Sequence, residues 1–279
     1  MTDNPLKNYL RKPEIYIKLP SGGKWWPEGS IEIPPNEELP IMAMTGHDDL
    51  IMKNADGLMN GSTSVEVIQS CVPNIKNAWA GPNVDIEYLF IALRIASYGN
   101  ELDVEKACSV CSETTKFGIN LHGVLESLQF PDFSTTVQVG DLHFMLKPST
   151  YKMSNLSAQK LYEQQRAILA AQSSELTIES REKILRDTIQ KLGEISTNQM
   201  IEYIEYVILP DGSKVTNKEH IIEFINQSSR KDFNLLKQGI DEKNAQYSTP
   251  KIPFVCAACG HKESTQFEFN PSNFFAADS

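Results

Sequence analysis

Hydrophobic residues repeat at helical spacing in one long stretch of the first half of the chain. Between residues 84 and 97, apolar side chains stand at i, i+3, i+4, i+7 and i+10: Ile86, Leu89, Phe90, Leu93 and Ala96. This repeat lines one face of an α-helix, and Gly99 is a stop signal just beyond it. We therefore expect a core-facing helix over 84–97. Its charged residues, Asp85, Glu87 and Arg94, are expected to compensate the helix dipole and to pair at the surface.

Alternation of apolar and polar residues predicts short strands on both sides of this helix. Residues 136–139 and 142–146 alternate around a Gly-Asp dipeptide, which is typical of a β-hairpin turn. Residues 15–19 and 31–33, near the N-terminus, alternate in the same way. Acidic residues in a first helical turn are favourable, so the sequence over 37–44 predicts the start of another helix.

The composition changes between Ser154 and about Ala245, where Gln, Glu, Lys and Ile are frequent and prolines are few. Amphipathic patterns in this stretch predict a helical insertion made of several successive helices. The segments 196–199 and 216–219 have the spacing of capping boxes, and Asp211-Gly212 is expected to form the turn between two helices. The apolar faces are assigned to an internal bundle, with a partner-binding surface as the alternative.

Four of the five cysteines form two Cys-x-x-Cys pairs in opposite halves of the chain, Cys108 with Cys111 and Cys256 with Cys259. A two-residue spacer lets a tight turn direct both sulfurs at one metal ion, and two such turns complete a tetrahedral shell. Strands that flank the two pairs are expected over 102–106, 116–121, 252–255 and 264–269. The pattern predicts one closed four-thiolate zinc site, although 144 residues lie between the pairs.

Other interpretations of the cysteines are two separate sites, each completed by other groups or by other chains, or ordinary thiols without a metal. An iron–sulfur cluster uses the same ligands, but a closed tetrahedral site favours zinc. Redox chemistry of the thioredoxin type requires a cysteine at a helix N-terminus, and neither pair opens a predicted helix. His261 is interpreted as a polar residue that closes a turn, with replacement of one sulfur as a metal ligand as the alternative. Cys71 is interpreted as a small buried hydrophobic residue.

The composition argues against a membrane protein, a secreted protein and a general nucleic-acid-binding protein. The chain has 279 residues, of which 41% are hydrophobic, and a formal net charge of −10. It has no run of about 18 uninterrupted apolar residues and no signal-peptide pattern, so we expect it in a reducing cytoplasm, which favours metal binding over disulfides. The negative charge opposes a broad phosphate-binding surface, because nonspecific nucleic-acid affinity comes mostly from Lys and Arg.

Catalytic motifs are absent from the sequence. It contains no phosphate-binding Gly-rich loop, no nucleophile elbow and no His-Glu-x-x-His helix, and its five histidines are scattered. A metal held by four thiolates has no open position for water or substrate, so such a site would stabilise the fold. We expect that the protein is not an enzyme.

These patterns predict an α+β fold, in which a small core of short antiparallel strands and helices carries a zinc-ribbon-like site that is split by a helical insertion. The predicted division of the chain has three parts. Residues 1–150 form an N-terminal α+β core with the first cysteine pair, and residues 151–245 form the helical insertion. Residues 246–279 carry the second cysteine pair and a tail that returns to the core.

Several segments, taken in order, resemble a known family. They are Tyr16–Lys24, Ile31–Pro35, Asn36–Leu39, Asp85–Gly99 with the first cysteine pair, and the second pair with Asn270–Phe275. Together they resemble the baseplate hub assembly protein family of T-even-type contractile-tailed bacteriophages. The resemblance covers about residues 14–150 and the C-terminal part, and it does not cover the helical insertion.

The resemblance implies a non-enzymatic role in assembling the central hub of a phage baseplate, as an assembly factor or as a component retained in the particle. It implies hub and tail proteins as partners, in the host cytoplasm or in the virion baseplate. Self-association is left open, and neither membranes nor nucleic acids are expected partners. The alternative is a zinc-ribbon nucleic-acid-binding protein of phage transcription or replication.

Four aromatic residues are candidates for contacts with a partner: Trp25, Trp26, Phe274 and Phe275. For the two tryptophans, packing at a strand end is the stronger interpretation. The two phenylalanines lie near the end of the sequence, so they are expected either to dock on their own domain or to enter a partner.

Overall fold

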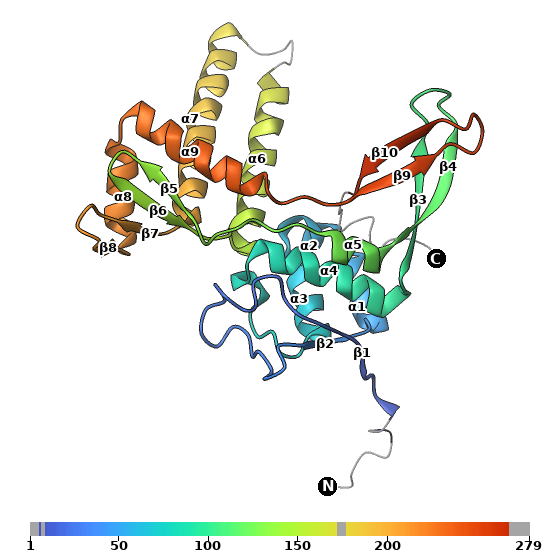
Figure 1. Cartoon of the computed structure of the whole chain (residues 1–279). Helices are drawn as coiled ribbons and strands as arrows, with labels where there is room; N and C mark the ends of the chain where they lie inside the picture. The colour runs from blue at the N-terminus through green and yellow to red at the C-terminus, as the bar shows by residue number, and fades with distance from the viewer. Residues whose placement is uncertain (1–5, 7–8, 172–176, 268–279) are drawn as a thin grey trace. The chain divides into compact units, whose positions relative to one another are not determined.

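The structure is a computed structural model that describes residues 6, 9–171 and 177–267. Contacts divide the described chain into a first unit, up to Phe130 and from Ser248 onward, and a second unit, residues 131–247 (Figure 1). Gln129 and Ser248 exchange two backbone N–H···O hydrogen bonds of 3.1 and 3.2 Å. The chain therefore leaves the first unit and returns to it at adjacent points, and the second unit is an insertion.

The first unit contains a helical part and two β-hairpins. Its helices are α1 (Gly46–Met52), α2 (Ala55–Asn60), α3 (Ser62–Cys71), the 3-10 turn η2 (Ala78–Ala80), α4 (Asn83–Tyr98) and α5 (Leu121–Ser127). Its antiparallel strand pairs are β1 (Pro13–Ile17) with β2 (Leu39–Met42), β3 (Glu101–Ala107) with β4 (Thr114–Asn120), and β9 (Lys251–Val255) with β10 (Lys262–Gln266). Short antiparallel strands mixed with helices confirm the predicted α+β class.

The long helix α4 forms the centre of the helical part, and its bounds agree with the apolar repeat. Ile86, Leu89 and Ala92 are completely buried, and α4 packs against α3, α5, β1 and β2. Gly99 follows the helix with a φ of 90°, a backbone conformation that favours glycine. Each Å² of apolar surface that is removed from water stabilises a fold by roughly 25 cal/mol. The burial of this face therefore makes α4 a strong contributor to the stability of the helical part.

Residues 39–42 form strand β2, so the prediction of a helix start over 37–44 is wrong. Leu39 and Ile41, two residues apart, are completely buried, which is the period of a strand with one face in a core. The preceding acidic residue belongs to a turn, because the N–H of Glu37 donates to the carbonyl oxygen of Pro34 at 2.8 Å. Pairing with β1 thus decides the local structure, and the acidic signal marks the turn before the strand.

Two charged residues of α4 are buried, which corrects the expectation that they lie at the surface. The Asp85 side chain accepts hydrogen bonds from the Ser21 backbone N–H at 3.0 Å, from the Trp26 Nε1–H at 2.7 Å and from the Ser21 hydroxyl. Burial raises the pKa of Asp85, and the hydrogen bonds from Ser21 and Trp26 oppose this rise. Arg94 is 4% exposed, and its guanidinium carbon lies 4.3 Å from the Tyr98 ring centroid.

The two adjacent tryptophans differ in their surroundings. Trp26 is 9% exposed, and it packs closely on the segment after η2, where a Cβ on Gly81 would lie 2.5 Å from its ring. Trp25 is half-buried, and the Lys24 ammonium lies 4.4 Å from its ring centroid. Trp26 therefore offers little surface to a partner, whereas part of Trp25 stays accessible.

The described residues of the second unit form a four-stranded antiparallel sheet and four helices. Its strands, in sheet order, are β5 (Thr136–Val139), β6 (Leu142–Leu146), β7 (Ile204–Ile208) and β8 (Lys214–Val215). Its helices are α6 (Tyr151–Ala171), α7 (Ile178–Tyr203), α8 (Lys218–Gln227) and α9 (Arg230–Asn244). The hairpin over 136–146 forms where it was predicted, but it lies in this unit and not in the N-terminal part, because β6 pairs with β7.

The region expected to contain helices alone also contains the strands β7 and β8. Helix α7 runs without a break through the predicted cap at 196–199, and the Asp211-Gly212 turn connects β7 to β8. The reason is tertiary, because the β-branched residues Ile204, Val207 and Ile208 of β7 pair with β6. The start of α8 was predicted correctly, but its N-cap is Asn217, whose side chain accepts from the Glu219 N–H at 2.8 Å.

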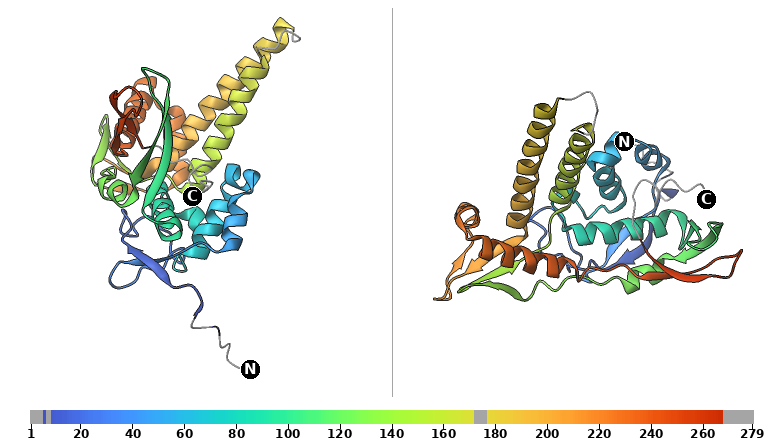
Figure 2. Two further views of the ribbon diagram at one scale, coloured as in Figure 1. Left: turned by 90° about the vertical axis from the view of Figure 1, so that its right-hand side faces the viewer. Right: turned by 90° about the horizontal axis from the view of Figure 1, so that it is seen from above.

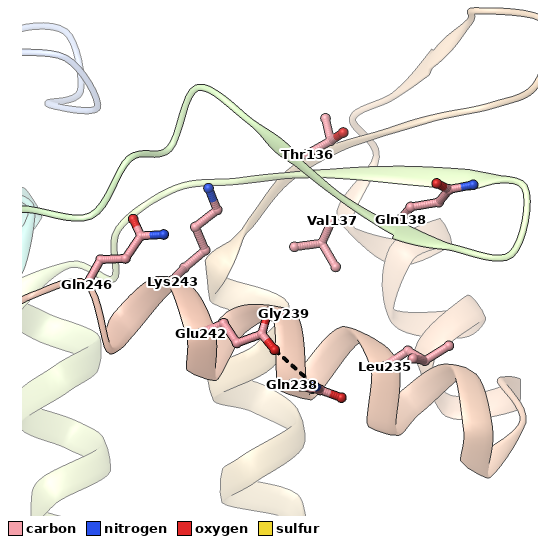
Figure 3. A pocket seen from close by; sticks show the side chains of 9 residues that line it. All are labelled: Thr136, Val137, Gln138, Leu235, Gln238, Gly239, Glu242, Lys243 and Gln246. Atoms are coloured by element: carbon pink, nitrogen blue, oxygen red, sulfur yellow. Dashed lines mark hydrogen bonds between the residues drawn. The ribbon is translucent and has the colours of Figure 1, made fainter.

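A groove of about 440 Å³ lies between β5 and α9 in the second unit (Figure 3). Lys243, at the end of α9, donates from Nζ to the Asp132 carbonyl oxygen and to the Thr135 hydroxyl. Gly239 lies beside Val137, and a Cβ on Gly239 would be 2.4 Å from the Val137 side chain. Glycine at this position therefore lets α9 approach β5 closely.

We expect Gly239→Ala to lower the free energy of unfolding of the second unit by about 1–3 kcal/mol, because the new methyl group overpacks the contact with Val137. The matched control is Gly193→Ala in the middle of α7, where a Cβ meets nothing within 4 Å. Alanine is the better helix former, so the control is expected to raise stability by about 0.4–1 kcal/mol. Urea unfolding followed by circular dichroism measures both, and equal effects of the two changes would contradict the close approach.

Candidate metal centre

The two cysteine pairs lie at the ends of the two β-hairpins of the first unit. The first hairpin joins β3 to β4, with Ala107 opposite Thr114, and carries Cys108 and Cys111 in its turn. The second hairpin joins β9 to β10, with Val255 opposite Lys262, and carries Cys256 and Cys259. The strands agree closely with those expected from the sequence, and each turn follows directly from the strand before it.

The two turns have the same backbone hydrogen bonds. In each turn, the N–H of the first cysteine donates to the carbonyl oxygen five residues later, at 3.0 Å in the first turn and 2.9 Å in the second. The carbonyl oxygen of the same cysteine accepts from the N–H four residues later, at 2.9 and 3.0 Å. That fourth residue is left-handed in both turns, with φ of 61° for Ser112 and 71° for Gly260. The turns are therefore two equivalent halves of one site.

The four sulfurs converge as a metal site requires. All four lie within 4.8 Å of one another, and the nearest pairs join the two turns: Cys108 Sγ to Cys259 Sγ at 3.7 Å and Cys111 Sγ to Cys256 Sγ at 3.6 Å. Zinc–sulfur bonds of about 2.3 Å place neighbouring sulfurs of a tetrahedron roughly 3.8 Å apart. These distances are too long for disulfides, and all four cysteines are free. The arrangement is compatible with one zinc ion.

The electrostatics of the four thiols also favour a cation. Backbone N–H groups of Cys259 and Ala258 lower the pKa of the Cys256 thiol to about 6. The Glu113 N–H lowers the pKa of Cys111, but the sulfurs of Cys259 and the other two cysteines outweigh it and raise that pKa to about 12. Close thiolates repel one another, so the full set of ligands ionises only around a positive charge. A soft divalent ion such as zinc fits this donor set.

A small core and several polar links join the hairpins below the sulfurs. Cys108, Phe254 and Cys256 form a buried cluster, on which Phe117 packs edge-on with ring centroids 5.4 Å apart. Glu263 on β10 pairs with Lys106 on β3 at 3.0 Å and accepts from the Ser109 hydroxyl at 2.9 Å. Besides the cysteines, the two hairpins are therefore joined by a small buried core and by the polar contacts of Glu263.

The other candidate residues lie outside this cluster. His261 has its Nε2 3.9 Å from a Glu263 oxygen, and it is not among the four convergent ligands. Cys71 is buried in the helical part, and burial raises its pKa to about 11. Phe274 and Phe275 lie outside the described residues. Thr115 also links the hairpins, because its hydroxyl accepts from the Ala257 N–H at 3.1 Å. No sequence pattern indicated this contact or those of Glu263.

Comparison with known proteins gives the family of the chain. No curated protein and no solved structure gave a significant match. A family described as T4 bacteriophage base plate protein matches residues 12–276. This match confirms the resemblance of the N-terminal and C-terminal segments and also spans the insertion, which the resemblance did not cover. It extends over nearly the whole sequence, and the chain therefore belongs to the family of T4 bacteriophage base plate proteins.

Proposed function

We propose that this base plate protein acts in the assembly of the central hub by binding other baseplate proteins, without catalysing a reaction. The observation that carries the proposal is the closed four-cysteine cluster in a base plate protein. Cys108, Cys111, Cys256 and Cys259 would hold a zinc ion, which supplies folding energy when it is bound. With four thiolates there is no free position on the metal for water or substrate.

Binding alone is sufficient for such a role. A protein that holds hub subunits in a productive arrangement reduces the entropic cost of their association. Covering apolar surface on unassembled subunits also prevents their aggregation. The chain is suited to this, because its second unit presents accessible helices and its first unit is held together by the cysteine cluster and the α4 core.

The charges near the metal centre support a protein partner over a nucleic acid. Residues 101–120 and 251–266 contain four lysines and five acidic residues. Two of the lysines are already paired, Lys106 with Glu263 at 3.0 Å and Lys116 with Glu105 at 2.9 Å. Zinc ribbons that bind nucleic acids depend on cationic contacts with phosphates, and this pair of hairpins has no surplus of them.

In a phage that lacks this chain, we expect baseplates without a central hub, because hub subunits fail to associate productively. Supplying the wild-type chain from a plasmid should restore complete baseplates. Electron microscopy of purified baseplate particles counts the fraction that contains a hub. Quantitative mass spectrometry of virions and lysates then shows whether the chain stays in the particle. Normal numbers of hubs in the absence of the chain would contradict the proposal.

A further inference from the structure

The helices α6 and α7 of the second unit pack side by side as an antiparallel pair (Figure 2). Polar and apolar side chains are buried together on these two helices, and the apolar ones include Ile195 and Met200. The buried polar side chains include Ser157, Gln164 and Thr188, which are 6%, 7% and 3% exposed. A helical pair normally buries its apolar residues and exposes its polar ones. In this pair, some polar side chains are buried, so the positions of the large apolar side chains matter.

Several large apolar side chains lie on the outside of the pair. Leu169, Ile178, Leu185 and Ile189 are 65%, 75%, 42% and 70% exposed, and we call these four residues the arm patch. They cluster at the end of the pair where α6 stops and α7 begins. Single exposed apolar residues are ordinary, but a contiguous group of them marks an interaction surface.

Helical phase places the arm patch on one side of the pair. Ile178, Leu185 and Ile189 stand at i, i+7 and i+11 of α7, which is one stripe of a helix. A pocket lined by residues 160–164 of α6 and 191–198 of α7 shows which levels of the two antiparallel helices meet. If this matching of levels is continued along the antiparallel helices, Leu169 of α6 lies level with residues 185–189 of α7. The position of Leu169 around the axis of α6 places its side chain on the same side of the pair as the α7 stripe.

We propose that a second copy of this chain covers the arm patch, with α7 packed antiparallel against α7 of the other copy around a two-fold axis. A two-fold interface must be self-complementary, and the stripe has this property. An axis level with residue 184 brings Ile178 within one residue of the level of Ile189 in the other copy, and Leu185 within two residues of the level of its own counterpart. The same axis places Glu182 opposite Arg186, so an acidic residue meets a basic one at both symmetric positions.

Charge also favours a second copy as the occupant. The whole chain has a net charge of −10, but residues 151–203 contain seven basic and seven acidic residues. Two of these helical pairs therefore meet with little net repulsion, although the chains as a whole repel each other. Glu182 and Arg186 are both exposed beside the stripe, where they can pair across the axis.

The first test is analytical ultracentrifugation of the full chain over a range of concentrations. We expect a concentration-dependent dimer. Ile189→Glu places a charge in the stripe and should raise the dissociation constant of the dimer at least tenfold. The matched control is Leu50→Glu on α1, which starts from a side chain that is 66% exposed but lies outside the arm patch. It should leave dimerisation unchanged. Circular dichroism checks that both variants are folded.

A charge exchange then identifies the partner as a second copy. Glu182→Arg and Arg186→Glu should each weaken the dimer severalfold, because each places like charges opposite each other. The double variant should recover wild-type affinity, because it restores opposite charges across the axis. A monomeric wild type at all concentrations, an equal effect of Leu50→Glu, or a double variant no better than the single ones would each overturn the proposal.

Discussion

Replacing Cys108 and Cys111 together by serine is expected to reduce bound metal from one ion per chain to none and to unfold both hairpins of the metal centre. Isolated two-stranded hairpins are marginal in water, and the buried core shared by these two is small. Apparent binding free energies of structural zinc reach about 10–16 kcal/mol, so we expect the folding of the hairpins to depend on the ion. Elemental analysis measures the metal, and hydrogen exchange over residues 101–120 and 251–266 measures the unfolding.

The matched control for this change is Cys71→Ser, which removes a buried thiol that is not part of the cluster. The control variant should keep its metal and its exchange protection in the hairpins, although it loses some stability in the helical part. A strong chelator added to the wild type should reproduce the effect of the double substitution. If the double variant kept its metal and its protection, the four cysteines would not be a metal site.

The second large effect is expected from Asp85→Ala, which should lower the free energy of unfolding of the first unit by about 3–5 kcal/mol. Asp85 is completely buried and accepts hydrogen bonds from Ser21 and Trp26. Removing the carboxylate leaves the buried Trp26 Nε1–H and the part-buried Ser21 N–H without their acceptor. Urea unfolding followed by tryptophan fluorescence measures the loss.

Two further variants separate the hydrogen bonds of Asp85 from other effects. Asp85→Asn keeps the size of the side chain and one acceptor oxygen, so its cost should be smaller than that of Asp85→Ala. Glu66→Ala removes an exposed acidic residue of the neighbouring helix α3 and should change stability by less than about 0.5 kcal/mol. Equal losses for Asp85→Ala and Glu66→Ala would show that the buried carboxylate is not important for stability.

Local patterns predicted the elements whose sequence signal and tertiary surroundings agree. The apolar repeat gave α4, and alternation around a Gly-Asp dipeptide gave the hairpin of β5 and β6. The prediction was wrong where a distant partner overrides the local signal. Strand β2 forms because it pairs with β1, although acidic residues precede it, and β7 forms because it pairs with β6, although it directly follows a long helix.

At the candidate site, too, local sequence predicted some features, whereas others depend on tertiary contacts. The spacing of Cys108, Cys111, Cys256 and Cys259 was enough to predict that the four sulfurs converge, because the chemistry of a thiolate site restricts both residue type and turn geometry. The buried state of Asp85 and Arg94 was not predictable from their position on a helix. The burial of Asp85 depends on how the segment around Ser21 and Trp26 folds over α4, and no local repeat encodes that contact.

The hydrogen bonds between Gln129 and Ser248 close off the second unit as an insertion between the two cysteine pairs. This arrangement determines the order in which the parts of the protein can fold during synthesis. The second cysteine pair emerges from the ribosome 145 residues after the first, which takes about 7–30 s at 5–20 residues per second. During that interval the first turn has two ligands and no counterpart. The inserted unit can fold completely in this time, because domains generally fold as units. Closure of the metal centre is then a late, long-range step, and a ribosome that stalls within the insertion leaves a chain with half a site.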